Sequence, residues 1–397
     1  MQKPQTIFSQ VINLLPQKQF QRCVKRYEGN KNVRTFSCWD QFLCMAFAQL
    51  TYRESLRDIE ACLRAVGVKL YHLGIRGKVS RATLADANEK RDWRIFADFG
   101  QSVIKMAQRE LISDDFGLDL DNAVYALDST VIETCLSLFP WTFWADRENK
   151  GGLKAHVLLD VRRNIPTFID ITERKVHDLH ALDKLKGEPN AFYVMDRNYI
   201  DFRRLYALEQ AHAFFVVRLK SNISLQRIYS RKIDKSTGVR SDQIVHRSTK
   251  NTQRRFAYPS KLRRIHFYDE ETENRLFFIT NNFEIPANTI AALYKKRWQV
   301  ELFFKWVKQN LRIQKFYGNS SNAVKTQIWI AVTVYLLVAI AKKRFHLPHS
   351  HYTILQVLSV TLLEKKPILR AFAEQSYNPD NDDTINQLKL FGESTGQ

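Results

Sequence analysis

The sequence predicts an α/β protein in which a mixed sheet lies between helical segments at both ends of the chain. Three observations predict this class. Residues 1–115 show helical periodicity, short runs rich in Val, Ile, Phe and Tyr begin near Asp121, and helix-compatible segments separate the later runs. Such an order of elements is typical of a mixed α/β sheet rather than of an all-helical or all-β protein.

The first segment, residues 1–115, is predicted to be a helical DNA-binding domain. Ser37 is a suitable N-cap for an apolar helix, Gly67 is a suitable stop for the next one, and Ser80 or Thr83 is a suitable start for those that follow. Basic residues between the helices favour a DNA-binding module, whereas the periodicity alone fits a plain helical bundle equally well. Both interpretations stay open at this point.

The second segment, residues 116–345, is predicted to carry three strands joined by turns and then helix, strand, helix, strand. The strand-like runs are VYALDSTVIET, LKAHVLLDV, IPTFIDITERK, FYVMDRNYI and HAFFVVRLK. Residues 220–283 are expected to form a β-rich insertion, and from residue 221 to 268 it contains twelve Lys or Arg against two Asp. A C-terminal helix and a polar tail are expected in 346–397.

The charge of the chain predicts a polyanionic partner. Its 397 residues include 61 Lys and Arg against 41 Asp and Glu, a net charge of +20. Nucleic acid is favoured over a membrane, because the longest apolar run has only 14 residues (328–341). The N-terminus has no signal-peptide pattern, and the five cysteines include no CxxC pair. We therefore expect a cytosolic protein that binds nucleic acid.

The stretch YKKRWQVELFFKWVK, residues 294–308, predicts a helix with one charged stripe. At about 100° per residue, Tyr294, Arg297, Glu301, Lys305 and Lys308 fall within about 80° of one another. The opposite side is apolar and should face the core; it contains Val300, Phe303, Trp306, Val307 and Leu311. The stripe alone fits a solvated face with i,i+4 ion pairs as well as it fits a binding site.

Two aspartates change this balance. Asp128 ends the apolar run VYAL and Asp196 ends AFYVM, so each is expected at the carboxyl edge of a strand. Singly, each could close a strand or cap a turn. Together with Glu301 they supply the oxygen ligands that Mg²⁺ prefers, and Arg297, Lys305 and Lys308 would supply cations beside them.

The residues also resemble a known family. The spacing Tyr294-x2-Arg297-x3-Glu301-x6-Lys308 is similar to the YREK signature of bacterial insertion-sequence transposases of family four in that classification. LDST around Asp128 and DRNYID around Asp196 resemble that family's two aspartate motifs. The basic insertion lies where the family has one, and the resemblance covers nearly the whole chain except the C-terminal tail.

This resemblance implies an RNase H-like core and a catalytic triad of Asp128, Asp196 and Glu301. The triad would bind two Mg²⁺ ions, with Mn²⁺ able to substitute. It further implies cut-and-paste transposition: nicking of double-stranded DNA at the terminal inverted repeats, then strand transfer to target DNA. A homodimer on paired ends and a cytoplasmic, nucleoid-associated location follow by the same analogy.

Further DNA contacts are predicted around the triad. In the family, Tyr294, Arg297 and Lys308 grip phosphate near a flipped base, and Trp298 matches an aromatic position suited to stacking. Core packing of Trp298 is a competing interpretation that its angle slightly favours. Lys154 and Arg197 could touch phosphate or be solvated. Two other functions remain: a catalytically inactive, transposase-derived DNA-binding protein, and a structure-selective RNase H-like nuclease.

Overall fold

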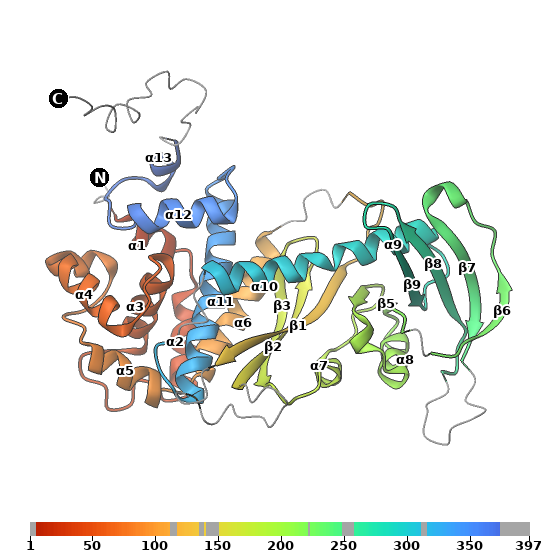
Figure 1. The fold of residues 1–397 in the computed structure, drawn as a ribbon. Helices are drawn as coiled ribbons and strands as arrows, with labels where there is room; N and C mark the ends of the chain where they lie inside the picture. Colours follow the sequence, from red (N-terminus) through yellow and green to blue (C-terminus); the bar gives the residue numbers. More distant parts are fainter. Residues whose placement is uncertain are drawn as a thin grey trace, which may run out of the picture.

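The computed structural model describes residues 5–111, 117–134, 139, 151–220, 223–247, 258–310 and 316–373. The described chain forms a helical bundle at one end and a long sheet that extends away from it (Figure 1). Leu311, Cys135 and the polar tail beyond residue 373, all used in the sequence predictions, lie outside the described residues.

The bundle begins with helices that start where the sequence predicts. The Ser37 side chain accepts from the Asp40 amide in a capping box, and the Ser55 side chain caps the next helix by accepting from the Asp58 amide. Ser80, rather than Thr83, is the N-cap of the helix that follows. The helices of this part are α1 (Ile7–Ile12), α2 (Gln17–Arg26), α3 (Cys38–Leu50), α4 (Leu56–Val66), η1 (Gly67–Leu73), α5 (Arg81–Lys90) and α6 (Arg94–Glu110).

The C-terminal helices complete the same bundle. They are α11 (Ser321–Arg344), α12 (His351–Thr361) and α13 (Ile368–Ala373). The backbone amides of Ile7 and Phe8 donate to the carbonyls of Glu364 and Leu362, so the two ends of the described chain lie side by side. The helical unit is therefore assembled from segments more than 200 residues apart. The predicted boundaries at residues 115 and 345 instead assign α11 to the catalytic domain.

Helix α11 is the central helix of this bundle. It is long and apolar enough to cross a membrane, but 94% of its most apolar window is buried inside the protein. It packs chiefly against α6, α3 and α5. At the crossing with α6, Gly100 lies under the Trp329 ring, and a Cβ at Gly100 would be 2.8 Å from that ring. The domain boundaries predicted at residues 115 and 345 remain predictions.

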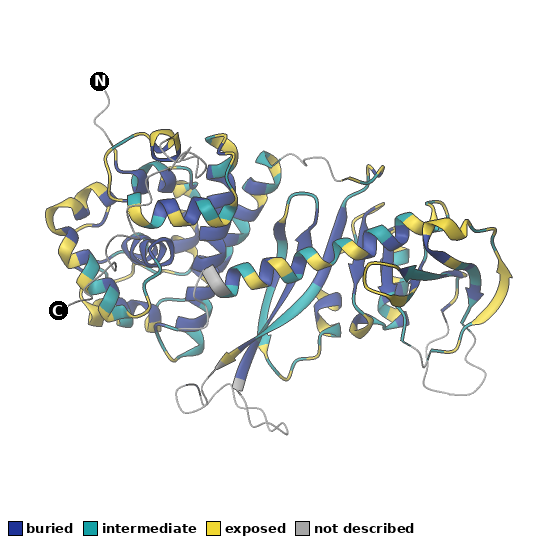
Figure 2. Cartoon of the chain, turned by 45° about the horizontal axis from the view of Figure 1, so that its top comes forward, coloured by how far each residue is buried: buried dark blue, intermediate teal, exposed yellow. Residues whose placement is uncertain are grey.

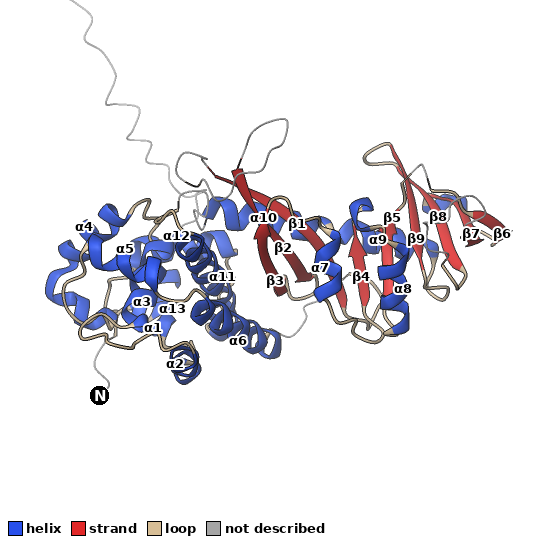
Figure 3. Ribbon diagram, turned by 90° about the horizontal axis from the view of Figure 1, so that it is seen from below, coloured by secondary structure: helices blue, strands red, loops and turns tan. Residues whose placement is uncertain are grey.

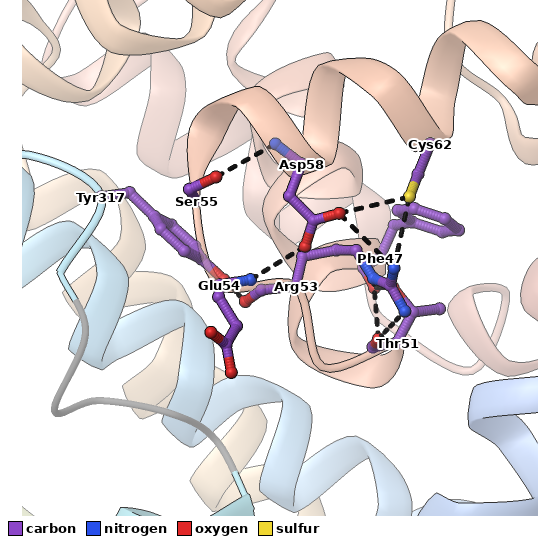
Figure 4. A network of polar contacts seen from close by, with 8 residues as sticks. All are labelled: Phe47, Thr51, Arg53, Glu54, Ser55, Asp58, Cys62 and Tyr317. Atoms are coloured by element: carbon purple, nitrogen blue, oxygen red, sulfur yellow. Dashed lines mark hydrogen bonds and ion pairs between the residues drawn. The ribbon is translucent and has the colours of Figure 1, made fainter.

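A polar network ties the bundle to the chain that leads into α11 (Figure 4). The Tyr317 hydroxyl donates to the Arg53 carbonyl at 2.6 Å. The Arg53 guanidinium in turn lies 3.5 Å from the Asp58 carboxylate and donates to the Cys62 sulfur at 3.3 Å. The turn after α3 is thus bonded to the segment that follows the charged helix predicted at 294–308.

The strands of the described chain form one nine-stranded sheet in the order β3-β2-β1-β4-β5-β9-β8-β7-β6 (Figure 3). β1, β2 and β3 are antiparallel, whereas β4 and β5 run parallel to β1. The order of β1 to β5 is that of an RNase H-like core, which confirms the fold that the resemblance implies. These strands are β1 (Val124–Thr134), β2 (Gly151–Asp160), β3 (Ile165–Glu173), β4 (Phe192–Met195) and β5 (Phe214–Arg218).

The predicted insertion continues this sheet instead of forming a separate body. Its strands are β6 (Gln226–Ser230), β7 (Val239–His246), β8 (Leu262–Asp269) and β9 (Asn274–Thr280), and β9 pairs with β5. A buried Arg263–Asp242 ion pair at 2.8 Å joins β8 to β7. The outermost strand, β6, is exposed along its length (Figure 2).

Helices cover both faces of the core sheet, and the alternation of side chains decides which face each residue reaches. Tyr125, Leu127 and Met195 pack with α7 (Leu179–Lys184) and α8 (Phe202–Gln210). Ala126 and Val194 pack with the cluster that contains α9 (Ala287–Lys296) and α10 (Trp298–Asn310). Even-numbered residues of β1 and β4 therefore face α9 and α10.

The close contact at Gly100 predicts an unusual response to alanine. Gly100→Ala should lower the free energy of unfolding by about 1–3 kcal/mol, because the added methyl group overpacks the contact with Trp329. In an ordinary helix interior the same change stabilises. Chemical denaturation of Gly100→Ala and of the exposed α6 control Lys105→Ala measures this. A gain in stability for Gly100→Ala would contradict the packing described.

Candidate active site

Asp128 and Asp196 lie side by side where the parallel pairing of β1 with β4 stops. Asp196 follows the end of β4, whereas Asp128 lies inside β1, which continues to Thr134. Leu127 of β1 and Met195 of β4 are the last register partners of that pairing, and each aspartate is the next residue. Both side chains follow the even-numbered pattern that faces α9 and α10. The two aspartates are therefore neighbours in the sheet, but the prediction that Asp128 ends its strand is wrong, because β1 goes on beyond it as the antiparallel partner of β2.

Glu301 reaches these aspartates from α10, through Arg297. The Arg297 Nη1 donates to Asp128 Oδ2 at 2.7 Å, and its Nη2 donates to Glu301 Oε1 at 2.5 Å. One guanidinium thus spans two carboxylates from different elements. The Tyr294 hydroxyl, on the last turn of α9, donates to Asp196 Oδ1 at 3.5 Å, which connects the second aspartate to the helix before α10.

Arg297 occupies the junction between α9 and α10. Its amide donates to the Tyr294 carbonyl, and its own carbonyl accepts from the Val300 amide, so the chain tightens to i→i+3 bonds there. The sequence predicts one continuous helix over 294–308; the structure has two that are joined at this tight turn.

Burial dominates the electrostatics of the site. It raises the pKa of Asp128 to about 6; the Arg297 charge opposes this shift, and the charges of Glu301 and Asp196 add to it. Burial would lower the pKa of Arg297, but its neighbours Tyr294, Asp128 and Glu301 outweigh burial and raise it. The pKa of Asp128 therefore reports the balance between its burial, the Arg297 cation and the two neighbouring carboxylates.

The donor set fits a hard divalent cation. Carboxylate oxygens from Asp128 and Glu301 already share one positive group, and Asp196 is adjacent to Asp128 in the sheet. Among the described side chains, no three His, Cys, Asp or Glu groups meet in a metal-binding cluster. This agrees with the guanidinium of Arg297 lying between two of the carboxylates.

Comparison with known proteins identifies the family. Residues 120–337 match the sequence profile described as the transposase DDE domain. The chain belongs to the DDE transposases. Residues 3–76 match a second profile, described as a domain of unknown function.

Curated relatives of this transposase have similar descriptions. A putative transposase of Sinorhizobium fredii is 31% identical over 75% of this chain and 82% of its own. A probable transposase for the element IS5377 of Geobacillus stearothermophilus is 29% identical over 53% of this chain and 55% of its own. A putative transposase for the element IS4SA of a Synechocystis species is 26% identical over 76% of this chain and 80% of its own.

Family membership defines the activity at a coarse level. The protein is a DNA transposase that acts on DNA by phosphoryl transfer, and the transposase DDE domain implies dependence on a divalent metal ion. Among solved structures, a piggyBac transposase synaptic complex with hairpin DNA matches at a TM-score of 0.47 and 11% identity, over 99% of this chain and 86% of that chain.

The apolar side of α10 is buried as predicted, but Trp298 is not part of it. Val300, Phe303 and Val307 are buried, whereas 57% of Trp298 is exposed. The core-packing interpretation of Trp298 is therefore wrong: the residue begins α10 and lies beyond the edge of the apolar stripe. Lys305 is exposed, and burial lowers the pKa of the half-buried Lys308.

Arg197 and Lys154, both predicted as phosphate contacts, have different surroundings. Arg197 is exposed in the turn η3 (Arg197–Tyr199) directly after Asp196. Lys154 is paired with the Asp178 carboxylate at 3.2 Å and donates to the Val176 carbonyl. It lies on the sheet face opposite Asp128, so its surroundings give no support to a DNA contact.

Sequence reasoning missed two groups of residues near the site. The first is Asp178, which lies in the stretch HDLHALDKL; this stretch predicted only a helix. The strand register of β1 and β2 decides that Ser129 and Lys154 are its partners. The second group is a groove of about 790 Å³ beside Asp196, whose lining includes five cations and, among its described residues, no acid. The cations are Arg197, Arg218, Lys220, Arg264 and Arg275. The basic composition of the insertion was the signal for this groove.

The raised pKa of Asp128 predicts that ionisation of its carboxyl lowers the free energy of unfolding. Burial favours the neutral form of the Asp128 carboxyl. The stability that this neutral form contributes is fully present below pH 3.8, and it is lost as the pH rises through about 6. Asp128→Asn, which is always neutral, should be more stable than the metal-free wild type by up to about 3 kcal/mol at neutral pH.

Thermal and chemical unfolding in chelator, between about pH 4 and pH 7.5, measures this difference. The two proteins should be equally stable near the acidic limit, and an exposed control, Glu89→Gln, should show no such trend. A wild type more stable than Asp128→Asn at neutral pH would mean that the Arg297 ion pair outweighs the burial of the carboxylate.

Proposed function

We propose that Asp128, Asp196 and Glu301 are the catalytic and metal-binding residues of a cut-and-paste transposase that uses two Mg²⁺ ions, with Mn²⁺ able to substitute. The observation that carries this proposal is the arrangement of the three carboxylates: the Arg297 guanidinium spans Asp128 and Glu301, and Asp196 lies beside Asp128 in the sheet. When bound, such ions supply stabilisation of the attacking and leaving oxygens in a phosphoryl transfer. The reaction would nick the terminal inverted repeats and join the freed ends to target DNA.

The chain's own residues would position the DNA and balance its charge. Arg297 holds Asp128 and Glu301 through the two arms of its guanidinium, and the same planar fork fits a phosphate. We infer that metal and DNA together turn Arg297 from the carboxylates to the backbone, where Tyr294 and Lys308 would join it. In the absence of metal, Arg297 would thus neutralise the two carboxylates that Mg²⁺ would later bind.

The exposed surface around the site suits DNA. Trp298 and Lys305 lie on the exposed side of α10, and Arg197 leads from Asp196 into the basic groove. Inside that groove, Phe277 is 40% exposed and its ring stacks on His266 with centroids 4.2 Å apart. Cations without acids, next to an exposed aromatic ring, favour a nucleic acid strand.

Two finer proposals rest on family analogy. The active assembly is a homodimer on paired element ends, and the protein works in the cytoplasm on nucleoid DNA. Lys154, because of its pairing with Asp178, is the weakest of the proposed DNA contacts.

Two other activities differ from this proposal in their products. A catalytically inactive, transposase-derived DNA-binding protein would bind the element ends without nicking them. A structure-selective RNase H-like nuclease would cut DNA without producing joined products. Incubation of the protein and Mg²⁺ with a duplex carrying the element ends, plus a target plasmid, separates the three.

Glu301→Gln tests the third carboxylate while it keeps the shape of the side chain. Mg²⁺-dependent nicking should fall on the order of 10⁴-fold, because groups that act as a unit fail together, whereas affinity for the ends should persist. The control Glu284→Gln removes an exposed carboxylate before α9 and should leave both unchanged. Equal losses of nicking and of binding would argue against Glu301 as a metal ligand.

Arg275→Ala tests the groove. If Arg275 neutralises a phosphate, the variant should bind duplex DNA more weakly, and the slope of log affinity against log salt should shrink by about 1. Lys186→Ala removes one exposed positive charge before β4, at the opposite edge of the sheet, and serves as the control. An unchanged slope for Arg275→Ala would remove this groove from the DNA path.

A further inference from the structure

Behind Asp128, on the other face of the sheet, lies a compact polar cluster. The Asp178 carboxylate accepts from the Ser129 hydroxyl at 2.7 Å and from the Lys154 ammonium at 3.2 Å. The His156 Nδ1 lies 3.7 Å from the same carboxylate oxygen, and its Nε2 contacts the Thr172 hydroxyl at 3.0 Å. These side chains come from β1, β2, β3 and the start of α7.

Asp178 stands at the N-cap position of α7 but does not cap it. Aspartate is a favoured N-cap because its carboxylate accepts from the first helical amides. Here the side chain makes no such bond and turns to β1 and β2 instead. Helix α7 therefore presents a carboxylate to the strand that carries Asp128.

Ser129 connects this cluster to the active site through the sheet. Its side chain, at an odd-numbered position, points to the α7 face. Its backbone amide donates to Asp128 Oδ1 at 2.8 Å. Asp128 Oδ2 is the oxygen held by Arg297, so both oxygens of the first carboxylate are fixed, one of them by Ser129.

The cluster is largely shielded from water, so loss of one partner would leave another charged group buried without a partner. The exposed fractions of the side chains are 14% for Lys154, 20% for Asp178 and 1% for His156. Burial would raise the pKa of Asp178, but the Ser129 hydrogen bond and the Lys154 charge outweigh burial and lower it. A carboxylate that stays ionised in this setting holds its donors firmly.

We propose that Asp178 is a positioning residue for the transposition reaction, which fixes the direction of Asp128 by holding Ser129 from the opposite face of the sheet. The inference rests on the role proposed above for Asp128. Asp178 touches neither DNA nor metal; it acts through the residue that follows the catalytic carboxylate. Loss of such supporting partners typically costs 10–100-fold in metal affinity or activity.

A simple ion pair between α7 and β2 is the competing explanation. In that case the Ser129 hydroxyl would contribute nothing to the chemistry, and loss of the Lys154–Asp178 pair would change stability alone. Ser129→Ala separates the two, because it deletes the hydroxyl and leaves the ion pair in place. Ser129→Thr restores a hydroxyl at the same atom.

The experiment uses the full chain and two measurements. Calorimetric titration with Mg²⁺ alone reports metal affinity, and nicking kinetics on the element ends report kcat and KM. We expect Ser129→Ala to lose about 10–100-fold in Mg²⁺ affinity and in kcat, with KM for DNA and the melting temperature close to wild type. Ser129→Thr should recover most of this loss.

Variants of α7 complete the test. Asp183→Asn removes a carboxylate of the same helix that pairs with Arg204 instead of Ser129, and should behave as wild type. Asp178→Ala combined with Lys154→Met removes the acid without leaving an unpaired lysine, and should match Ser129→Ala in Mg²⁺ affinity.

The outcomes separate this inference from the proposed function. Asp128→Asn that binds Mg²⁺ like the wild type would overturn the metal role of Asp128 itself. Asp128→Asn without Mg²⁺ binding, together with wild-type affinity and kcat in folded Ser129→Ala, would overturn only the positioning role of Asp178.

Discussion

The largely buried guanidinium of Arg297, with its bonds to Asp128 and Glu301, is the interaction around which the candidate active site is organised. Carboxylates from a strand and a helix would repel each other in a partly buried site, and an unpaired buried charge is costly. Arg297 lies at the junction of α9 and α10, so its two arms reach Asp128 and Glu301 at once. The tight i→i+3 turn at this residue, the register of β1 with β4 and the burial of α10 all serve that placement.

The fold supports the site from both ends of the molecule. The bundle is built from N-terminal and C-terminal helices around α11, and Tyr317 bonds the chain between α10 and α11 to the turn after α3. On the other side, β9 pairs with β5 and carries the insertion strands away from the site as one continuous sheet. Because α9 and α10 follow β9 in the chain, the insertion leads directly into the two helices that carry Tyr294, Arg297 and Glu301.

Much of this could be predicted because the deciding signals are local. Caps such as Ser37, strand-like runs that end in aspartate, and the spacing from Tyr294 to Lys308 are written in adjacent residues. The sequence left Trp298 between a DNA contact and core packing, because an angle near the boundary of a stripe does not say where the partner surface ends. The partners of Asp178 and of α11 could not be placed, because the bonds from Ser129 to Asp178 and from Trp93 to Asn322 join residues that are 49 and 229 positions apart.

The sequence by itself determined the class of the fold, the basic character of the protein, the family resemblance and the three acidic residues at issue, since each depends on residue type and short-range order. Only the tertiary structure decided that Arg297 spans two of the carboxylates, that the insertion extends the main sheet, and that Ser129 links Asp128 to Asp178. The physical reason is that these contacts depend on strand register and helix docking. Both are fixed by burial across the whole chain and by no single stretch of it.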